Sequence, residues 1–538
     1  MNQSKRSAAL VAAKAHLSSA GYELDADGEL ANGELERATA SLLEKFRPFG
    51  CFDVLCQLFG GMRSNNRFGL GVYLTAREFS KPTTPSAIPY GFLLNLAVQL
   101  PPSTQLPEDP KTAWREAIEF AVALAAILDI QPRSQFWNVN VGPTQLGALL
   151  GRCALFDHVF TLRQWPWEIT LPVISEFFSA FPLDRMPQQL GWDLEDAFRL
   201  CEAIGHFSGL DPNIITKSAL LTAGAHRESF DRIINFFAHD ISIVNKDYDS
   251  PLASSQANLM FKPLIAIQPD TFFLPAASTS GPAFYEALMA AIRPLVNRNE
   301  IDDLQGTGTE RVFARLINDA GLPIVAANAK YNMGTNADGE CDLILADERH
   351  IVFLECKAKA LTRASMSGSE GAALTDFSLG IIKAHAQALQ HERVLRQNGT
   401  IVFSDGNTSL KFNGQEITRI ALTLLDHGAL HDRTLLFLIY ETLLRSRASG
   451  AGDDKSEEIA SKINQALLKI QTESLEIGIS EREQAFFTSS ASAASLSAYL
   501  QGVSDLDHFV HRIRCPMSYA SGNQMFDLYF GLNSKVIR

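Results

Sequence analysis

The pattern of apolar and polar residues is most regular in residues 339–359. Two short apolar runs, residues 343–346 and 351–354, flank the polar tetrapeptide 347–350. Short apolar runs joined by a polar turn are typical of a β-hairpin. With the turn centred on Glu348 and Arg349, the two strands bring together Ala346 and Ile351, Ile344 and Phe353, and Asp342 and Glu355.

Helix and strand patterns surround this hairpin. Residues 309–320 predict a helix capped by Thr307 or Thr309, and residues 323–327 predict a short strand. A helix over 377–396 and strands over 417–425 and 434–440 follow, which makes the order helix, three strands, helix, strand. The Ser- and Gly-rich residues 363–371 predict a loop that is long enough to close over a site.

The remainder of the chain is predicted to be mainly helical. Apolar spacing favours helices in residues 1–46, 112–128, 168–240 and 282–296, and after residue 442, including the Ser/Ala run 488–497. Residues 259–278 predict two β-segments around a Gln-Pro-Asp turn. The predicted fold is multidomain α+β, with a large, mainly helical N-terminal region (1–245), a connecting platform (246–300), an α/β core with a mixed sheet (301–442) and a helical C-terminal region (443–538).

Length and composition limit the classes of protein. The chain has 538 residues, too many for one core, and 46 % of them are hydrophobic, as in ordinary globular proteins. No apolar run reaches the ~20 residues of a membrane span, so we expect no membrane partner. Its seven cysteines are scattered without a CxxC pair, which favours reduced thiols in the cytoplasm over disulfides or zinc. No P-loop, GxSxG or HExxH motif is present.

The predicted hairpin concentrates charge at one point. Side chains alternate along a strand, so Glu355 and Lys357 share a face, and Asp342 lies opposite them. Carboxylates that face each other are destabilising unless a cation lies between them. Oxygen ligands suit Mg²⁺ or Mn²⁺, so the sequence predicts a divalent cation here. A solvated surface hairpin is the alternative interpretation.

At these residues the chain resembles the PD-(D/E)xK nuclease superfamily, whose fold is restriction-endonuclease-like. The resemblance rests on Asp342 at the start of one strand and on Glu355-Cys356-Lys357 on the next, and it covers residues 306–425. The branches nearest in appearance are the Holliday-junction-resolvase-like and RecB-like nucleases, which share the Gly-Glu-x-Asp-Leu-Ile run. This chain departs from the pattern at Cys341, where the superfamily motif has proline.

The resemblance implies an Mg²⁺-dependent nuclease with assigned residues. Asp342 and Glu355 would hold Mg²⁺ (or Mn²⁺) with the Cys356 carbonyl, and Lys357 would orient water or stabilise charge. Glu310 would be an outer metal ligand through water, although a favourable charge at a helix N-terminus explains it equally well. Gln387 and Gln390 lie where RecB-like members carry a site glutamine, and a solvated helix face is their alternative.

The expected substrate is nucleic acid, with DNA favoured. The net charge of −13 opposes broad DNA binding, so we expect a confined groove. Its predicted contacts are Lys359, Arg363, Lys383, Gln387 and Gln390.

Residues 215–239 have helix-turn-helix rhythm, with Arg227, Arg232 and Asn235 as candidate base readers. Two helices that simply pack together are the commoner cause of such a pattern. A catalytically inactive binding or scaffold protein is the alternative function. Association with a second copy or with a partner protein is left open.

Overall fold

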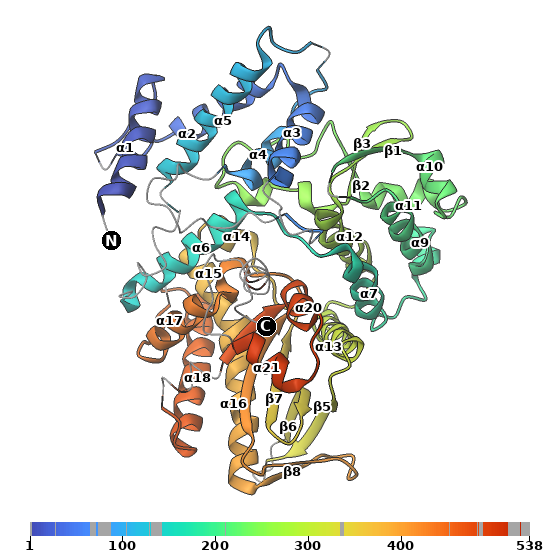
Figure 1. Ribbon diagram of the computed structural model, residues 1–538, viewed down its shortest axis with the longest axis vertical. Coiled ribbons are helices and arrows are strands. Elements are labelled where there is room, and N and C mark those ends of the chain that lie inside the picture. Colours follow the sequence, from blue (N-terminus) through green and yellow to red (C-terminus); the bar gives the residue numbers. More distant parts are fainter. Residues whose placement is uncertain are drawn as a thin grey trace.

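The structure is a computed structural model in which helices and β-sheets are combined (Figure 1). It describes residues 3–26, 28–64, 71–73, 88–103, 105–128, 130, 142–209, 211–333, 338–450, 452–480, 483, 488–514, 524 and 528. The α+β class predicted from the sequence is confirmed.

Helices form most of the described chain before residue 210; the apolar spacing predicted those within residues 1–46, 112–128 and 168–205, but not the helices at residues 50–64, 90–97 and 146–160. They bury their apolar stripes against one another; α5, for example, buries Ala117, Phe120 and Leu124 in a core shared with α1 and α2. In chain order these helices are α1 Gln3–Ser19, α2 Glu34–Phe46, α3 Gly50–Ser64, α4 Tyr90–Ala97, α5 Pro110–Ile127, η1 Pro143–Gln145, α6 Leu146–Phe160, α7 Trp167–Phe178, α8 Met186–Leu190 and α9 Leu194–Gly205.

A four-stranded sheet with the order β1-β4-β3-β2 follows. The two β-segments predicted around Gln-Pro-Asp are confirmed as β3 and β4. The elements are β1 Asn213–Thr216, α10 Lys217–Thr222, α11 Phe230–Phe237, β2 Ala238–Asp240, η2 Ser254–Gln256, η3 Leu259–Phe261, β3 Leu264–Gln268, β4 Thr271–Leu274, α12 Ala277–Ile292 and η4 Arg293–Leu295. The predicted helix-turn-helix corresponds to α10 and α11, and α11 buries Phe230, Ile233 and Phe237 in the core.

The second half of the chain is built around a five-stranded sheet with the order β11-β10-β7-β6-β5. β5, β6 and β7 are antiparallel, whereas β7, β10 and β11 are parallel, so the sheet is mixed. The elements are α13 Ile301–Asp319, β5 Ile324–Asn332, β6 Asp338–Ala346, β7 His350–Lys357, α14 Arg363–Met366, α15 Glu370–Phe377, a π-helical segment Ser378–Ile382, α16 Lys383–Asn398, β8 Thr400–Val402, β9 Ser409–Lys411, β10 Glu416–Thr423, η6 Gly428–His431, α17 Arg433–Leu444, α18 Asp454–Glu476, β11 Thr488–Ser492, α20 Ala493–Leu500 and α21 Leu506–Arg514.

Helices cover both faces of this sheet (Figure 1). On one face Leu354 of β7 packs in a core with Phe313 of α13, and on the other face Phe353 packs with Leu395 of α16. Strands buried on both faces have near-continuous apolar runs, which is why the hairpin was recognisable in the sequence. The hairpin strand β7, which carries the charged residues predicted from the sequence, is therefore flanked by α13 on one face and α16 on the other.

Two predicted elements near the sheet are wrong. Residues 434–440 belong to helix α17, whose N-cap is the Asp432 carboxylate, 3.0 Å from Leu435 N. A short apolar run does not distinguish a strand from a buried helix, and length decides between them. Within 488–497, residues 488–492 form the buried strand β11 instead of helix. β11 is parallel to β10, so the sheet extends beyond the domain boundary expected at residue 442.

Two segments beside the hairpin also differ from expectation. α13 begins at Ile301, so residue 309 is inside the helix and Thr309 Oγ1 donates to the Gln305 carbonyl at 2.7 Å. Residues 363–371, predicted as a loop, contain α14 and the start of α15. None of the helices in the described ranges is long and apolar enough to cross a bilayer.

Candidate active site

The hairpin has the predicted register. Regular pairing runs from Ala346–Ile351 through Ile344–Phe353 to Leu343–Leu354, where it stops. Asp342 is therefore not held directly across from Glu355, as we expected. Its Oδ2 instead accepts a hydrogen bond of 2.7 Å from the backbone N–H of Cys356, which fixes the carboxylate at the end of β7.

The Lys357 ammonium is the centre of the charged group. Its Nζ lies 3.5 Å from Asp342 Oδ2, 3.5 Å from Glu355 Oε2 and 3.1 Å from the Cys356 carbonyl oxygen. These are the three groups that the resemblance assigns as ligands of a divalent cation. All three side chains are largely buried, and Glu355 is only 1 % exposed. The predicted convergence of two carboxylates and one ammonium is present.

Burial and neighbouring charges shift the pKa values of Asp342 and Glu355 in opposite directions. Burial and the Glu355 charge raise the pKa of Asp342 to about 6. Burial alone would raise the pKa of Glu355 too, but the hydrogen bond and charge of His391 and the charge of Lys357 lower it. Burial opposes the ammonium form of Lys357, yet the two carboxylates raise its pKa. Strongly perturbed groups of this kind gather at functional sites.

Glu310 joins this group from the middle of α13. Because the helix begins at Ile301, a favourable charge at the helix N-terminus no longer accounts for this residue. Burial, then the charges of Asp342 and Glu340, raise the pKa of Glu310 to about 7. The carboxyl group is therefore electrostatically coupled to the hairpin, as an outer residue of the site would be.

His391 on α16 is a contact that the sequence did not indicate as part of the site. Its Nε2 lies 3.0 Å from Glu355 Oε1, and its Nδ1 lies 2.6 Å from the Tyr331 hydroxyl. A usable signal was present: His391 continues the i, i+4 series of Lys383 and Gln387 on one helix face.

The residues predicted to contact nucleic acid fall into different settings. Lys359 Nζ lies 2.9 Å from Asp376, and the Lys359 side chain is 37 % exposed. Arg363 donates to the Ser255 carbonyl and, at 2.9 Å, to Asn258 Oδ1, and its guanidinium stacks over the Phe261 ring. Arg363 therefore ties α14 to η2 and η3. This position makes it a structural contact in the described chain.

The helix α16 presents the other predicted contacts. Lys383 is exposed at the start of the helix. Gln387 is half-buried, and its Oε1 has no hydrogen-bond partner among the residues that the structure describes. Gln390 Nε2 is directed at the Met333 sulfur. Lys469 of α18 was missed: burial lowers its pKa, and the charges of Glu473 and Glu355 partly oppose this. The Lys469 ammonium thus lies close enough to interact electrostatically with Glu355 of the hairpin.

The donor atoms of the site are of the kind that binds the cation implied by the resemblance. Two carboxylates and a carbonyl converge on one ammonium, and Mg²⁺ is commonly bound through one or two carboxylates with water completing the shell. In the described ranges, no group of three or more His, Cys, Asp or Glu side chains is arranged to hold a metal by itself. The oxygen donors fit Mg²⁺ or Mn²⁺, which prefer oxygen ligands.

The candidate helix-turn-helix is held mainly by packing. Arg227 is exposed, but Arg232 donates to the Glu228 carbonyl at 3.0 Å and Asn235 donates to the Asp231 carbonyl at 3.0 Å. The side chain of Arg232 also lies against Gly191. Two of the three candidate base readers are thus engaged locally.

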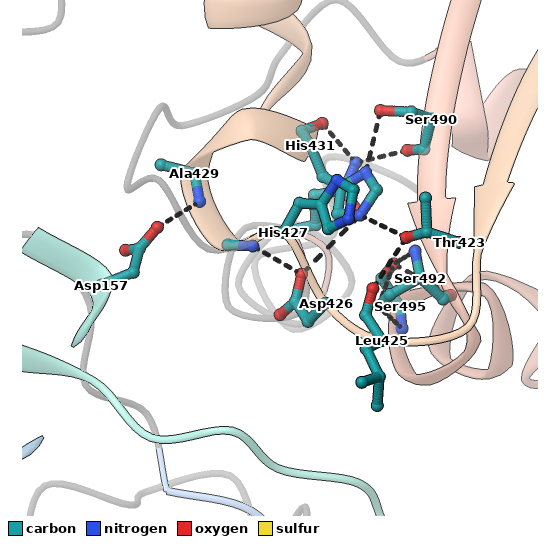
Figure 2. A network of polar contacts seen from close by, with 12 residues as sticks. Asp157, Thr423, Leu425, Asp426, His427, Ala429, His431, Ser490, Ser492 and Ser495 are labelled. Carbon is teal, nitrogen blue, oxygen red and sulfur yellow. Dashed lines mark hydrogen bonds and ion pairs between the residues drawn. The ribbon is translucent and has the colours of Figure 1, made fainter. Parts of the chain in front are cut away.

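A second polar cluster lies where β10 and β11 end (Figure 2). His431 contacts Ser490 Oγ through Nδ1 and Thr423 Oγ1 through Nε2, each at 3.0 Å, and its ring stacks on His427. Burial lowers the pKa of both histidines to about 3 and keeps them neutral. Ser490, His431 and Thr423 are all buried, so this cluster connects the two strands and offers no access to a substrate.

Comparison with known proteins adds no family to this description. No protein-family model, no curated protein and no solved structure matches the chain.

Proposed function

We propose that the protein is an Mg²⁺-dependent phosphodiesterase that cleaves nucleic acid, DNA in preference to RNA. One observation carries the proposal: the carboxylates of Asp342 and Glu355 and the Cys356 carbonyl converge on the Lys357 ammonium at the end of β7. The order α13-β5-β6-β7-α16-β10 supports it, since helix, three strands, helix and strand is the order of the PD-(D/E)xK core. A ligand site at the carboxyl ends of parallel strands is also common in open α/β sheets.

Each residue of the site would have a separate role in cleavage. Mg²⁺, or Mn²⁺ in its place, would be held by Asp342, Glu355 and the Cys356 carbonyl and would supply Lewis-acid polarisation of the phosphate. Lys357 would stabilise the negative charge that develops on the phosphate oxygens. Glu310, whose pKa lies near 7, is suited to hold a water and to accept its proton. Lys359, Lys383 and Lys469 would attract the backbone of the substrate.

The competing proposal is a nucleic-acid-binding protein with an inactive nuclease-like domain. Loss of activity requires only one missing group, whereas here Asp342, Glu355 and Lys357 are all present, and both carboxylates contact the Lys357 ammonium. The net charge of −13 limits the binding surface to a local basic patch in either case.

The test is cleavage by the full-length chain. Supercoiled plasmid, linear duplex, single-stranded DNA and RNA are incubated with Mg²⁺, Mn²⁺, Ca²⁺ or EDTA. We expect cleavage with Mg²⁺ or Mn²⁺ and none in Asp342→Ala. Glu348→Ala, which removes an exposed carboxylate at the opposite end of the same hairpin, is the matched control and should cleave normally. Binding without cleavage of any substrate would favour the inactive protein.

A further inference from the structure

Among the described residues Glu355 is one of the most deeply buried carboxylates, and each of its oxygens has a different neighbour. Oε1 lies 3.0 Å from His391 Nε2, whereas Oε2 lies 3.5 Å from Lys357 Nζ. A carboxylate only accepts hydrogen bonds, so the Nε2–H of His391 is the donor. One oxygen is therefore bound on the protein side, and the other oxygen faces the cation position.

The imidazole of His391 is itself held at its other nitrogen. Tyr331 at the end of β5 places its hydroxyl 2.6 Å from Nδ1. Both residues are almost completely buried, His391 at 3 % and Tyr331 at 1 % exposure. With both ring nitrogens bonded, the imidazole cannot rotate without losing a buried hydrogen bond, which costs about 1–3 kcal/mol.

The position of Tyr331 depends in turn on Gly339. The two residues pair across β5 and β6. A Cβ atom at residue 339 would lie 2.3 Å from Cζ of the tyrosine ring, far closer than van der Waals contact permits. Any side chain at this position would push the ring away from His391. The glycine in the Gly-Glu-x-Asp run thus has a physical reason in this chain.

We propose that Gly339, Tyr331 and His391 form a positioning chain that fixes Glu355 so that only Oε2 is presented to the divalent cation. This inference rests on the proposed function, because it assigns a role to residues behind a proposed metal ligand. The positioning chain runs from the paired strands β6 and β5 through α16 to Glu355 of β7. None of its three members is among the proposed cation ligands. They are positioning residues, and they set how firmly the ligand is held.

Groups that hydrogen-bond a metal ligand from behind typically contribute 10- to 100-fold to metal affinity or activity. His391→Leu removes both hydrogen bonds at similar volume and should weaken Mn²⁺ binding by about 10- to 100-fold. His391→Gln keeps an amide donor and should recover most of that loss. Tyr331→Phe and Gly339→Ala keep the His391 side chain but remove or displace the hydroxyl group that holds its Nδ1. Each should weaken Mn²⁺ binding by several-fold.

The experiment measures Mn²⁺ affinity of the full-length protein by electron paramagnetic resonance titration, with thermal melting in parallel. His385→Leu is the matched control, because His385 is a second buried histidine of α16 whose Nε2 bonds to the Ser489 carbonyl. A general structural effect would weaken Mn²⁺ binding equally in His385→Leu and His391→Leu. Positioning of Glu355 predicts that only the change at residue 391 does so, and that glutamine there restores binding.

The outcomes separate the inference from the proposed function. Mn²⁺ affinity within twofold of wild type in both His391→Leu and Tyr331→Phe would overturn the positioning chain while leaving the metal site intact. An unaltered protein that binds no Mn²⁺ would instead overturn the proposed function. If His391→Leu does not fold, Tyr331→Phe decides the question, because it removes a single hydroxyl group.

Discussion

Replacing Lys357 with methionine should increase the affinity of the protein for a divalent cation while abolishing cleavage. The ammonium contacts both carboxylates and the Cys356 carbonyl, so it occupies the point where a cation would contact the same groups. Mg²⁺ or Ca²⁺ must displace it. Methionine has similar length without the charge, and it removes the competitor while filling its space.

The magnitude follows from the two distances. A unit charge 3.5 Å from a carboxylate interacts with about 5 kcal/mol at an effective dielectric constant near 20, before desolvation is subtracted. Removing one partner of a buried pair commonly costs about 3–5 kcal/mol. The metal-free variant should therefore be clearly destabilised. A bound cation should reverse this, so we expect Ca²⁺ to bind at least about tenfold more tightly, equivalent to about 1.4 kcal/mol.

The assay is calorimetric titration with Ca²⁺, together with the thermal midpoint with and without Ca²⁺. The matched control is Lys330→Met, which removes an exposed lysine of β5 whose nearest carboxylate is Glu340 at 3.9 Å. Lys330→Met should change neither the Ca²⁺ affinity nor the Ca²⁺-induced rise in midpoint. Equal or weaker Ca²⁺ binding by Lys357→Met would refute the reasoning, since it would place the cation site away from the ammonium.

Four further outcomes are expected. Alanine in place of Asp342, Glu355 or Lys357 should reduce plasmid cleavage by more than about a hundredfold with an unchanged circular dichroism spectrum. Normal cleavage by one of these variants would remove that residue from the site. Mn²⁺ should replace Mg²⁺ while Ca²⁺ binds without turnover, and activity that persists after exhaustive EDTA treatment would exclude a metal mechanism. Lys383→Glu should weaken nucleic-acid binding and reduce the salt dependence by about one unit of slope per lost contact, whereas Arg363→Glu should chiefly lower the thermal midpoint; titrations at several salt concentrations check both. The low pKa of buried His431 means that the unfolded chain takes up a proton near its ordinary pKa of about 6.5 while the folded chain does not. Stability should therefore fall by up to about 1.4 kcal/mol per pH unit for this group as pH drops from about 6.5 toward 3, and urea unfolding of His431→Gln should lack that part of the dependence.

The hairpin was predictable because its strands are buried on both faces and therefore read as two short apolar runs around a polar turn. Ile344 and Phe353 pair as expected, whereas the position of Asp342 depends on a hydrogen bond from the Cys356 backbone N–H beyond the last regular pair. The start of α13 was not predictable, because Gly306 and Gly308 disfavour a helix interior. A Cβ at residue 308 would lie 2.5 Å from the Phe177 carbonyl oxygen, so close packing of α7 selects glycine there.

The remaining differences also arise from contacts between distant segments. Strand β11 consists of Thr, Ser and Ala, and only its place beside β10 imposes the extended conformation. The role of His391 depends on Tyr331, which is sixty residues away in the sequence. Arg363 was expected in a mobile loop, yet Asn258 and Phe261 engage it. Local patterns carry no information about such partners.

Strand β11 has a consequence for how the protein is made. The hairpin that carries the candidate active site is complete at Lys357, but the sheet receives its last strand only after α17 and α18 have left the ribosome. Until then β10 is a nascent edge with unpaired backbone groups, and such edges invite pairing with other chains. During synthesis the candidate active site is thus present for a time in a sheet that still lacks β11. A pause or a nick between residues 445 and 487 would prolong that stage and favour aggregation, and a supplied peptide that spans residues 488–514 would be expected to rescue the arrested chain.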